Sequence, residues 1–551
     1  MPVLWEKRSP YRVLDRDISR ARGEAVLRNN ILAVKALAEM LKTTLGPRGM
    51  DKIVVETSGE WFVTNDGATI LQNIDVRHPA AKLLIEVAKA QDKEVGDGTT
   101  SAVILAGELL SQALYLLQLK LHPSIIINGY KRALDIALKE MDKLARAVRL
   151  DDQEILERIC KTSLMSKNLG FATDHIVRIT VNAFQKIVED QRKEISIDKE
   201  NVLIVKKLGK SLSESILVEG IVIDKGVAHP LMPKRAVNAK IALISSPLKI
   251  EKAWCKAELA LRSMADIKRI IEEEIRYLKE NVVEKILKIG ANVILCENEI
   301  DESVQALLAK NNIMAVKRVR TSDMWRLTKA TGGKLVASLK DLTEADLGIA
   351  GTVEEIKIGH DKLVLVKDCP KARSVSILLR AGSKRQLDEA ERALNDALMN
   401  LITLTSKLRY VPGGGAIEMA LASIIRKEAK KYPNKEQLPM LTFADSLEAI
   451  PMTLAYNAGM DSTDVLMRLR SMHEKGDYAY GIEANSKKLV NMFEAGILEP
   501  VKLKEQVLKS AFEIASMILR VDDVYVGLDF FEKPPEPEDK NVPPTSETKK
   551  S

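Results

Sequence analysis

The feature that most constrains the fold is a change of pattern along the 551-residue chain. Residues 20–150 and the stretch from Leu387 to about Leu519 both have the periodicity of helices. From Asn201 to roughly Val366, short β-branched apolar runs alternate with helical stretches, which is typical of an α/β domain. Two similar helical ends around a different insert predict a discontinuous domain, joined to the insert by two linking segments.

The first helical end carries a clear apolar face. In residues 28–46, apolar side chains recur at steps of three and four, as an amphipathic helix requires. Gly46 and Pro47 are predicted to end this helix, because glycine tolerates a left-handed cap and proline cannot continue a helix. Two β-rich runs around Ser58 and Gly59 then predict a hairpin, and helices follow through about Arg146.

The insert is predicted to contain strands, one long helical segment and helical stretches between. Five apolar runs favour strands, at residues 201–208, 240–248, 290–298, 313–319 and 334–339. Residues 257–289 interrupt them with an uninterrupted helical pattern. The last twenty residues, from Glu532, are rich in proline and charge, which predicts a disordered tail.

Composition argues against several classes of protein. The net charge of +7 is small for this length, so specific nucleic-acid binding is not expected. No apolar run approaches the ~20 residues that span a bilayer, and the N-terminus lacks a signal-peptide core, which favours a cytoplasmic protein without membrane insertion. Four scattered cysteines and six dispersed histidines predict buried thiols rather than a metal site or disulfides.

No P-loop is present. Gly209, Lys210 and Ser211 match its end, but Ile204 stands where its first glycine belongs, so Lys210 is interpreted as an ordinary turn lysine. If the chain uses ATP, another arrangement must hold the phosphates.

The string from Gly96 to Ser101 offers such an arrangement, directly before a strongly apolar helix. Its glycines permit close approach of the backbone to a ligand, and hydroxyls with free N–H groups at a helix start suit an anion. Asp97 could hold Mg²⁺, which prefers one or two carboxylates with phosphate oxygens and water. The alternative is that Thr99 or Thr100 merely caps the helix, and on this string alone that alternative is the stronger.

Three further glycine-rich strings lie in the helical ends: LGPRGMDK (45–52), TNDGATI (64–70) and VPGGGAIEM (411–419). Each alone is more typical of a turn than of a ligand site. Their occurrence together, at opposite ends of one chain, favours a shared site.

Together with DVRHPAAK, QDKEVGDGTTSAVILAGELL and GILEP, these strings resemble the signature segments of group II chaperonins, the archaeal thermosome and its eukaryotic cytosolic relatives. The resemblance runs from about residue 20 to residue 524 and suggests a divergent archaeal subunit. It implies a multidomain α and α/β chaperonin fold. A mostly helical equatorial ATP-binding domain would comprise 1–149 and 404–526, an intermediate hinge domain 150–218 and 370–403, and an α/β apical substrate-binding domain 219–369, with a helical lid protrusion at about 257–280 and a tail at 527–551.

The resemblance also implies roles for individual residues. Asp97 would bind Mg²⁺, Asp66 would order the metal or the attacking water, and Asp396 would position or deprotonate that water. Asp396 would reach the nucleotide only when the intermediate domain swings down. Lys167 would sense the γ-phosphate. The other implied ATP-binding residues are Gly46, Pro47, Gly98, Thr99, Thr100 and Ser101 near the phosphates, Gly413, Gly414 and Gly415 near the nucleoside, and Gly481 and Glu499 around adenine and ribose.

Three positions depart from the family pattern: Lys93, Ala381 and Asn395. None removes a carboxylate of the motifs, so the resemblance implies an Mg-ATP-dependent chaperone subunit of a homo- or hetero-oligomeric double ring, with unfolded proteins as clients. The alternative is a structural or regulatory ring subunit with weak or no hydrolysis. A small-molecule kinase fits poorly, because the large α/β insert is remote from the glycine motifs.

Overall fold

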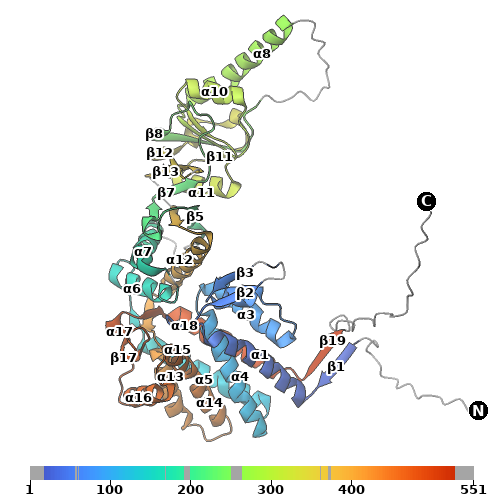
Figure 1. The fold of residues 1–551 in the computed structure, drawn as a ribbon, viewed down its shortest axis with the longest axis vertical. Coiled ribbons are helices and arrows are strands. Elements are labelled where there is room, and N and C mark those ends of the chain that lie inside the picture. The colour runs from blue at the N-terminus through green and yellow to red at the C-terminus, as the bar shows by residue number, and fades with distance from the viewer. Residues whose placement is uncertain are drawn as a thin grey trace, which may run out of the picture.

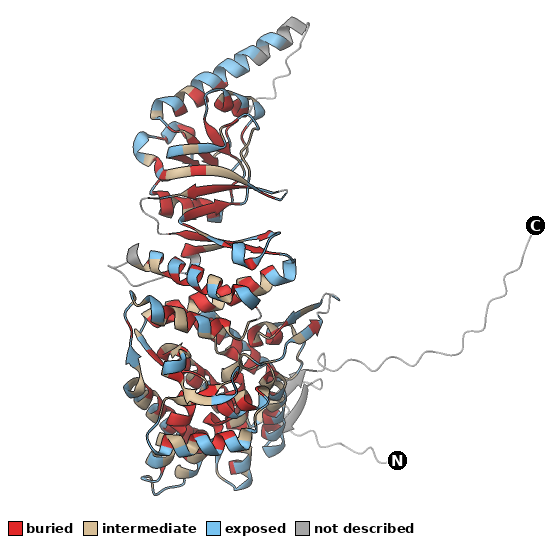
Figure 2. Cartoon of the chain, turned by 60° about the vertical axis from the view of Figure 1, so that its left-hand side comes forward, coloured by how far each residue is buried: buried red, intermediate tan, exposed pale blue. Residues whose placement is uncertain are grey.

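The computed structural model describes residues 18–55, 59, 61–167, 169–190, 199–249, 264–359, 361–369 and 374–527. The molecule is elongated, with a helical base, a smaller middle body and an upper body arranged along its long axis (Figure 1). Each encloses buried side chains of its own (Figure 2).

The base is built from both ends of the chain. Its core joins helices near residues 27–141 to helices near residues 411–519, as the pattern of two helical ends predicts. The helices are α1 (Glu24–Lys42), α2 (Gly67–Asn73), α3 (Pro79–Val95), α4 (Thr99–Gln118), α5 (Pro123–Leu144), α13 (Ala416–Ala429), α14 (Gln437–Leu447), α15 (Ala449–Asn457), α16 (Ser462–Glu474), α17 (Met492–Ala495) and α18 (Val501–Leu519).

Short strands complete the base. The predicted hairpin is present as β2 (Lys52–Val55) and β3 (Trp61–Thr64), paired antiparallel. Strands β1 (Ile18–Arg22) and β19 (Asp523–Gly527) pair the two ends of the chain. The others, which the helical periodicity of the two ends did not predict, are β4 (Arg146–Ala147), β15 (Arg409–Pro412), β16 (Tyr480–Glu483), β17 (Lys488–Asn491) and β18 (Leu498–Pro500).

The end of α1 differs from the prediction. The helix ends at Lys42, before Gly46, and Gly46 instead lies in the following loop with φ +82°. The Asn457 side-chain amide, from the end of α15, donates to the carbonyls of Lys42 and Leu45 at 2.9 Å each. These bonds tie the last residue of α1 and the loop that follows it to α15, so a residue from the far half of the chain helps to fix how the helix ends.

Helix α4 corrects the expectation about apolar runs. By length and composition alone it could cross a membrane. In this structure it packs between α1, α14 and α18, and side chains such as Val103, Leu109 and Ala113 are fully buried there. Its apolar character is therefore that of a core helix.

The middle body also takes chain from two separate segments. Helices α6 (Gln153–Leu164), α7 (Thr173–Asp190) and α12 (Lys384–Thr405) pack on a three-stranded sheet. In this sheet β14 (Val375–Ala381) lies between β5 (Val202–Leu208), to which it is parallel, and β6 (Ile216–Val218), to which it is antiparallel. Short 3₁₀ turns are η1 (Gly170–Ala172), η2 (Lys199–Asn201) and η3 (Leu212–Glu214).

The upper body is an α/β unit. Its sheet has the order β10-β9-β8-β12-β13-β7, with β11 beside β8, and separate apolar clusters pack around it. The strands are β7 (Gly220–Ile223), β8 (Arg235–Ile244), β9 (Val293–Cys296), β10 (Met314–Val316), β11 (Leu335–Val336), β12 (Gly348–Ile358) and β13 (Asp361–Lys367). All five runs predicted as strands form strands, four here and one as β5.

Helix α8 (Met264–Leu278) extends away from the sheet at the far end of the molecule (Figures 1 and 2). A π-helical turn (Lys279–Val283) joins it to α9 (Glu284–Ile289), and α10 (Glu302–Lys310) and α11 (Thr321–Thr331) follow. The predicted helix at 257–289 is thus found from residue 264 onward, and residues 257–263 lie outside the described part. Cys160, Cys296 and Cys369 are buried free thiols, as predicted, and Cys255 lies outside that part too.

Candidate nucleotide and metal site

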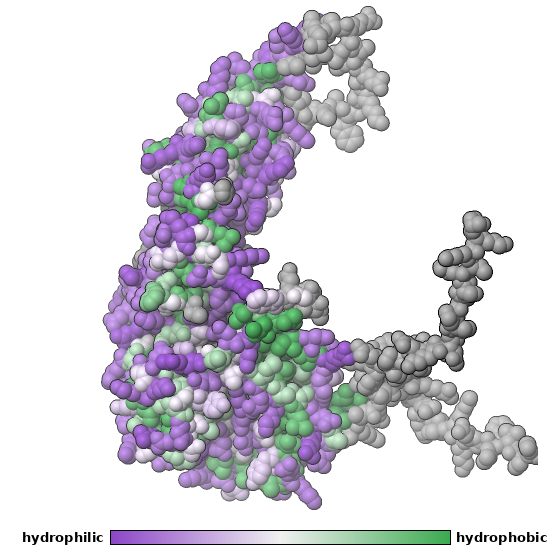
Figure 3. Space-filling model, in the orientation of Figure 1, coloured by the Kyte–Doolittle hydropathy of each residue, from purple (hydrophilic) through white to green (hydrophobic). Residues whose placement is uncertain are grey.

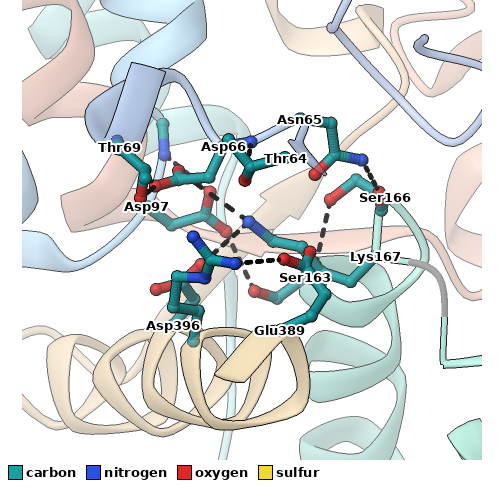
Figure 4. A network of polar contacts seen from close by, with 12 residues as sticks. Thr64, Asn65, Asp66, Thr69, Asp97, Ser163, Ser166, Lys167, Glu389 and Asp396 are labelled. Carbon is teal, nitrogen blue, oxygen red and sulfur yellow. Dashed lines mark hydrogen bonds and ion pairs between the residues drawn. The ribbon is translucent and has the colours of Figure 1, made fainter. Parts of the chain in front are cut away.

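The predicted site residues gather where α12 of the middle body meets the base (Figure 4). Asp66 precedes α2, Asp97 precedes α4, Lys167 follows α6 and Asp396 lies on α12. The structure therefore brings together four charged residues from four distant segments of the chain.

The glycines around Asp97 give this loop its shape. Gly96 ends α3 and Gly98 begins α4, and both have left-handed backbone (φ +77° and +76°). A Cβ at Gly98 would lie 2.7 Å from Val507 Cγ2, so the position is closed to larger residues. Thr99 and Thr100 lie inside α4, and no side chain caps this helix. The capping interpretation is therefore wrong, and the N-terminus of a 20-residue helix faces the site without a side-chain cap.

The carboxylate of Asp97 is held by its neighbour Gly98 and by two residues of the middle body. Its Oδ1 accepts from the Gly98 amide at 2.7 Å. Its Oδ2 accepts from Asn400 Nδ2 at 2.8 Å and from Ser163 Oγ at 3.0 Å. Sequence reasoning missed Asn400 and Ser163, although Asn400 follows Asp396 by one helical turn and so shares its face of α12.

Asp66 is the N-cap of α2. Its Oδ2 accepts from the Thr69 amide at 2.9 Å and from Thr69 Oγ1 at 2.6 Å. A Cβ at Gly67 would lie 2.5 Å from Thr100 Oγ1, so glycine allows the loop of Asp66 to approach the start of α4. Burial alone would raise the pKa of Asp66, but the charge of Lys167 and the Thr69 hydrogen bonds outweigh it and lower this pKa.

Lys167 lies between the carboxylates. Its Nζ is 3.0 Å from Asp396 Oδ2 and 3.8 Å from Asp66 Oδ1, and the Lys167 side chain is only 7% exposed. Burial would lower the pKa of Lys167, but the surrounding carboxylates raise it, so the ammonium stays charged. Burial raises the pKa of Asp396 to about 8, against the effect of Lys167, and Asp66 and Asp97 add to the rise.

A cavity opens beside this cluster. Eight of the predicted residues line it: Gly46, Pro47, Asp97, Gly98, Ser101, Gly414, Gly415 and Glu499. Thr99, Thr100, Asp66 and Lys167 line the adjoining recess, which shares Gly46, Asp97, Gly98 and Ser101. The predicted phosphate-side residues therefore form one continuous surface.

Two predicted residues lie behind this surface. Gly413 sits where a Cβ would be 3.2 Å from Glu499 Oε1, and its amide donates to the Ile497 carbonyl. Gly481 packs against the carbonyl of Gly414, 2.8 Å from where its Cβ would be. Neither lines the cavity, and both serve close backbone packing that shapes its wall.

A buried cation that the sequence did not single out lies at the other end of the cavity. Lys504 Nζ donates to Glu418 Oε1 at 2.7 Å and forms an ion pair with Glu499. Lys504 is 9% exposed, and its pairing fixes the carboxylate of Glu499 at the cavity wall. The only sequence signal for Lys504, which lies on α18, was its position five residues after Glu499.

Among the residues that the structure describes, no group of three or more histidine, cysteine, aspartate or glutamate side chains is arranged to hold a metal by itself. A site with one or two carboxylates suits Mg²⁺, which takes its remaining ligands from phosphate oxygens and water. The donor set around Asp97 and Asp66 fits such an ion.

Comparison with known proteins shows which family the chain belongs to. The chain is 45% identical to the thermosome subunit beta of Desulfurococcus mucosus, over 91% of this chain and 100% of that protein. It is 45% identical to thermosome subunit beta of Aeropyrum pernix and 43% identical to thermosome subunit alpha of Archaeoglobus fulgidus, each over 94% of both chains. The sequence profile of the TCP-1/cpn60 chaperonin family matches residues 37–527. The chain therefore belongs to the TCP-1/cpn60 chaperonin family, and within it to the group II chaperonins.

Proposed function

We propose that this chain is a subunit of an ATP-dependent molecular chaperone that couples Mg-ATP binding and hydrolysis to the enclosure and folding of other proteins. The observation that supports this best is the meeting of Asp396, on the middle body, with Asp66, Asp97 and Lys167 at the edge of a glycine-lined cavity in the base. Hydrolysis in such a site depends on the position of the middle body, so chemistry and domain movement are linked.

Each residue has a distinct role in this proposal. The α4 N-terminus with Thr99, Thr100 and Ser101 binds the phosphates, and Gly46, Pro47, Gly414 and Gly415 shape the cavity for the nucleoside. Asp97 holds Mg²⁺, whose charge neutralises phosphate oxygens during phosphoryl transfer. Glu499, fixed by Lys504, faces the ribose and base. Gly413 and Gly481 support the wall rather than touch the ligand.

Asp396 is the proposed base that orients the attacking water. In this structure its carboxylate is engaged by Lys167 at 3.0 Å. A phosphate near Lys167 competes for the same ammonium, which frees Asp396 to accept a hydrogen bond from water. Lys167 thereby reports phosphate to Asp396, and Asp66 keeps the ammonium in place from the other side.

The domain assignment follows the same proposal. The base corresponds to the equatorial domain (1–149 and 404–526), the middle body to the intermediate domain (150–218 and 370–403) and the upper body to the apical domain (219–369). Helix α8 lies in the proposed lid protrusion (about 257–280), of which residues 257–263 are outside the described part.

Assembly into a double ring with homologous subunits, in the cytoplasm, completes the proposal. The hairpin β2–β3 carries exposed apolar side chains, Ile53, Val55, Trp61 and Val63, and Figure 3 shows apolar surface gathered in this region of the base. Exposed apolar patches of this kind suit burial against another protein chain, and a neighbouring subunit is the partner that ring assembly supplies.

Phosphate release by the purified, assembled protein tests the proposal. We expect steady-state release that requires Mg²⁺ and is lost in Asp396→Ala. A particle of ring mass by native mass spectrometry that releases no phosphate above Asp396→Ala would instead support the second candidate, a structural or regulatory ring subunit. Asn395, where the family commonly has histidine beside the catalytic aspartate, is the feature that favours this second candidate.

A further inference from the structure

Arg392 lies one helical turn before Asp396 on α12 and was not among the residues that the motifs indicated. Its side chain lines a surface recess with Phe62, Thr69 and Asn73, so it reaches from the middle body to β3 and the start of α2. The same helix thus presents Arg392, Asp396 and Asn400 to the base at successive turns.

The contacts of Arg392 leave part of its guanidinium unused. Its Nη2 donates to Glu389 Oε2 at 2.8 Å, on the same helix. Its Nε is buried, and within the described residues it has no hydrogen-bond partner. An arginine held in this way is expected to act through its charge, because a guanidinium cannot lose its proton in a protein.

The charge of Arg392 acts on Asp66. Three acidic side chains, Asp66, Asp97 and Asp396, lie around the ammonium of Lys167, so acidic groups outnumber basic groups in this cluster. Burial raises the pKa of Asp66, whereas Lys167, the Thr69 hydrogen bonds and Arg392 lower it, and Arg392 has the smallest effect of these. Thr69 both donates hydrogen bonds to Asp66 and lines the recess of Arg392, so this recess adjoins the N-cap of α2.

We propose that Arg392 is a positioning residue for the hydrolysis proposed above: its charge attracts the Asp66 carboxylate and thereby sets how α12 docks on the base. Asp396 and Asn400 depend on that docking, because one helix carries all three side chains. Arg392 touches neither the nucleotide nor the water in this proposal and acts through Asp66. The inference rests on the proposed function and adds a residue that links the position of the middle body to the chemistry.

The test is single-turnover hydrolysis of prebound Mg-ATP by the assembled protein, with ADP affinity measured separately. We expect Arg392→Gln to slow the chemical step by about 10- to 100-fold, the usual loss when a supporting partner of a site is removed. ADP affinity should stay within a few-fold of wild type, and Arg392→Lys should recover part of the rate because it restores the charge. Unchanged single-turnover hydrolysis in Arg392→Gln would overturn the inference.

Two matched variants separate positioning from a structural role. Glu389→Gln removes the carboxylate partner of Arg392 but keeps the guanidinium, so the rate of hydrolysis should stay near that of wild type. An equal loss of rate in Glu389→Gln and Arg392→Gln would mean that only their ion pair matters and would contradict the inference. Lys384→Gln removes a positive charge from an exposed position of the same helix and should also leave the rate unchanged.

A double-mutant cycle tests whether Arg392 acts through Asp66. In an Asp66→Asn background, Arg392→Gln should cause no further slowing, and independent, multiplying effects would contradict the inference. Failure here is distinguishable from failure of the proposed function. Wild-type protein without Mg-dependent hydrolysis would overturn both, whereas active wild type with an equally active Arg392→Gln would overturn this inference alone.

Discussion

The ammonium of Lys167 lies 3.0 Å from the carboxylate of Asp396, and this contact joins the segment after α6 to the middle of α12. Both side chains are largely buried, so the contact is protected from solvent screening. It places Asp396, the proposed base, in direct contact with Lys167, the proposed phosphate sensor. Removal of either partner should therefore have a different effect from removal of the metal-binding carboxylate.

Asp396→Ala should separate binding from turnover. The variant keeps Asp97 and the glycine loops, so it should still bind Mg-ATP, whereas the chemical step should slow by the ~10²–10⁴ typical of a lost base or water-positioning group. Quenched single-turnover assays would show ATP that stays bound and uncleaved. In a mixed ring, only this subunit must carry the change, because active neighbours would mask the loss. Unchanged single-turnover hydrolysis would exclude Asp396 from this role.

Asp97→Ala should weaken binding as well as hydrolysis. The carboxylate accepts hydrogen bonds from Asn400 and Ser163, so its loss also frees two middle-body side chains. We expect no measurable turnover and a lower affinity for Mg-ATP, measured by calorimetry with and without Mg²⁺. Asn400→Ala is the control, because it keeps the Asp97 carboxylate, and its affinity for ATP should still depend on Mg²⁺. Wild-type turnover in Asp97→Ala would refute the metal assignment.

Removal of residues 257–280 should spare hydrolysis and abolish encapsulation. The described part of this segment, α8, projects from the upper body and is remote from the cavity in the base (Figure 1). Phosphate release should match wild type, while an unfolded client incubated with ATP should become accessible to protease. Nucleotide-dependent protease cleavage within this segment of the wild type would support the same role. Cleavage that is equal in all nucleotide states would count against a lid.

Glu448→Gln should destabilise the base in a pH-dependent way. Glu448 is buried and ion-paired with Arg426, at 2.6 Å, and with Arg470. Burial alone would raise the pKa of Glu448, but the hydrogen bonds and charges of the two arginines outweigh it and lower this pKa. A lowered folded-state pKa contributes stability above the unfolded pKa of 4.5, and this stability is lost as pH falls through the folded-state value.

The variant should therefore lose about 1–3 kcal/mol of unfolding free energy at pH 7, as expected when a hydrogen-bonded partner is removed, because both arginines are partly exposed and Arg426 keeps Asp445. The difference in Tm from wild type should narrow below about pH 4.5. Asp464→Asn, which removes an exposed partner of Arg468 on α16, should change Tm little at any pH. A constant difference in Tm between Glu448→Gln and wild type from pH 7 to pH 4 would show that the ion pairs of Glu448 do not stabilise the base.

The sequence predicted the elements well where a period or a motif was strong. The helical ends, the hairpin at Ser58 and Gly59 and all five apolar strands of the insert are found. Predictions failed where a distant residue decides the local outcome. Gly46 was expected to end α1. The helix ends earlier, and Asn457 from the other half of the chain donates hydrogen bonds to the carbonyls of Lys42 and Leu45, a contact that no local pattern contains.

The candidate site divides in the same way. Motifs identified Asp66, Asp97, Lys167 and Asp396, and the structure brings them together. Residues that support them were missed because their roles depend on docking of α12, which a one-dimensional pattern cannot show. Asn400 and Arg392 could have been suspected from their spacing of four from Asp396, whereas Ser163 and Lys504 have no such signal. Gly413 shares a motif with the cavity residues Gly414 and Gly415 yet lies behind the wall, as Gly481 does, since close packing and ligand contact both select glycine.

The pairing of β6 with β14 has a consequence for how this chain can vary. Ser376 of β14 lies opposite Val218 of β6, so the chain leaves the middle sheet and returns to it on adjacent strands. In topological terms the whole upper body is one loop of a hairpin. The entropy of closing a loop grows only slowly with its length, and the two ends of this one are held together by their own pairing. The upper body can therefore gain, lose or exchange segments, while the helix that carries Asp396 keeps its place on the sheet beneath.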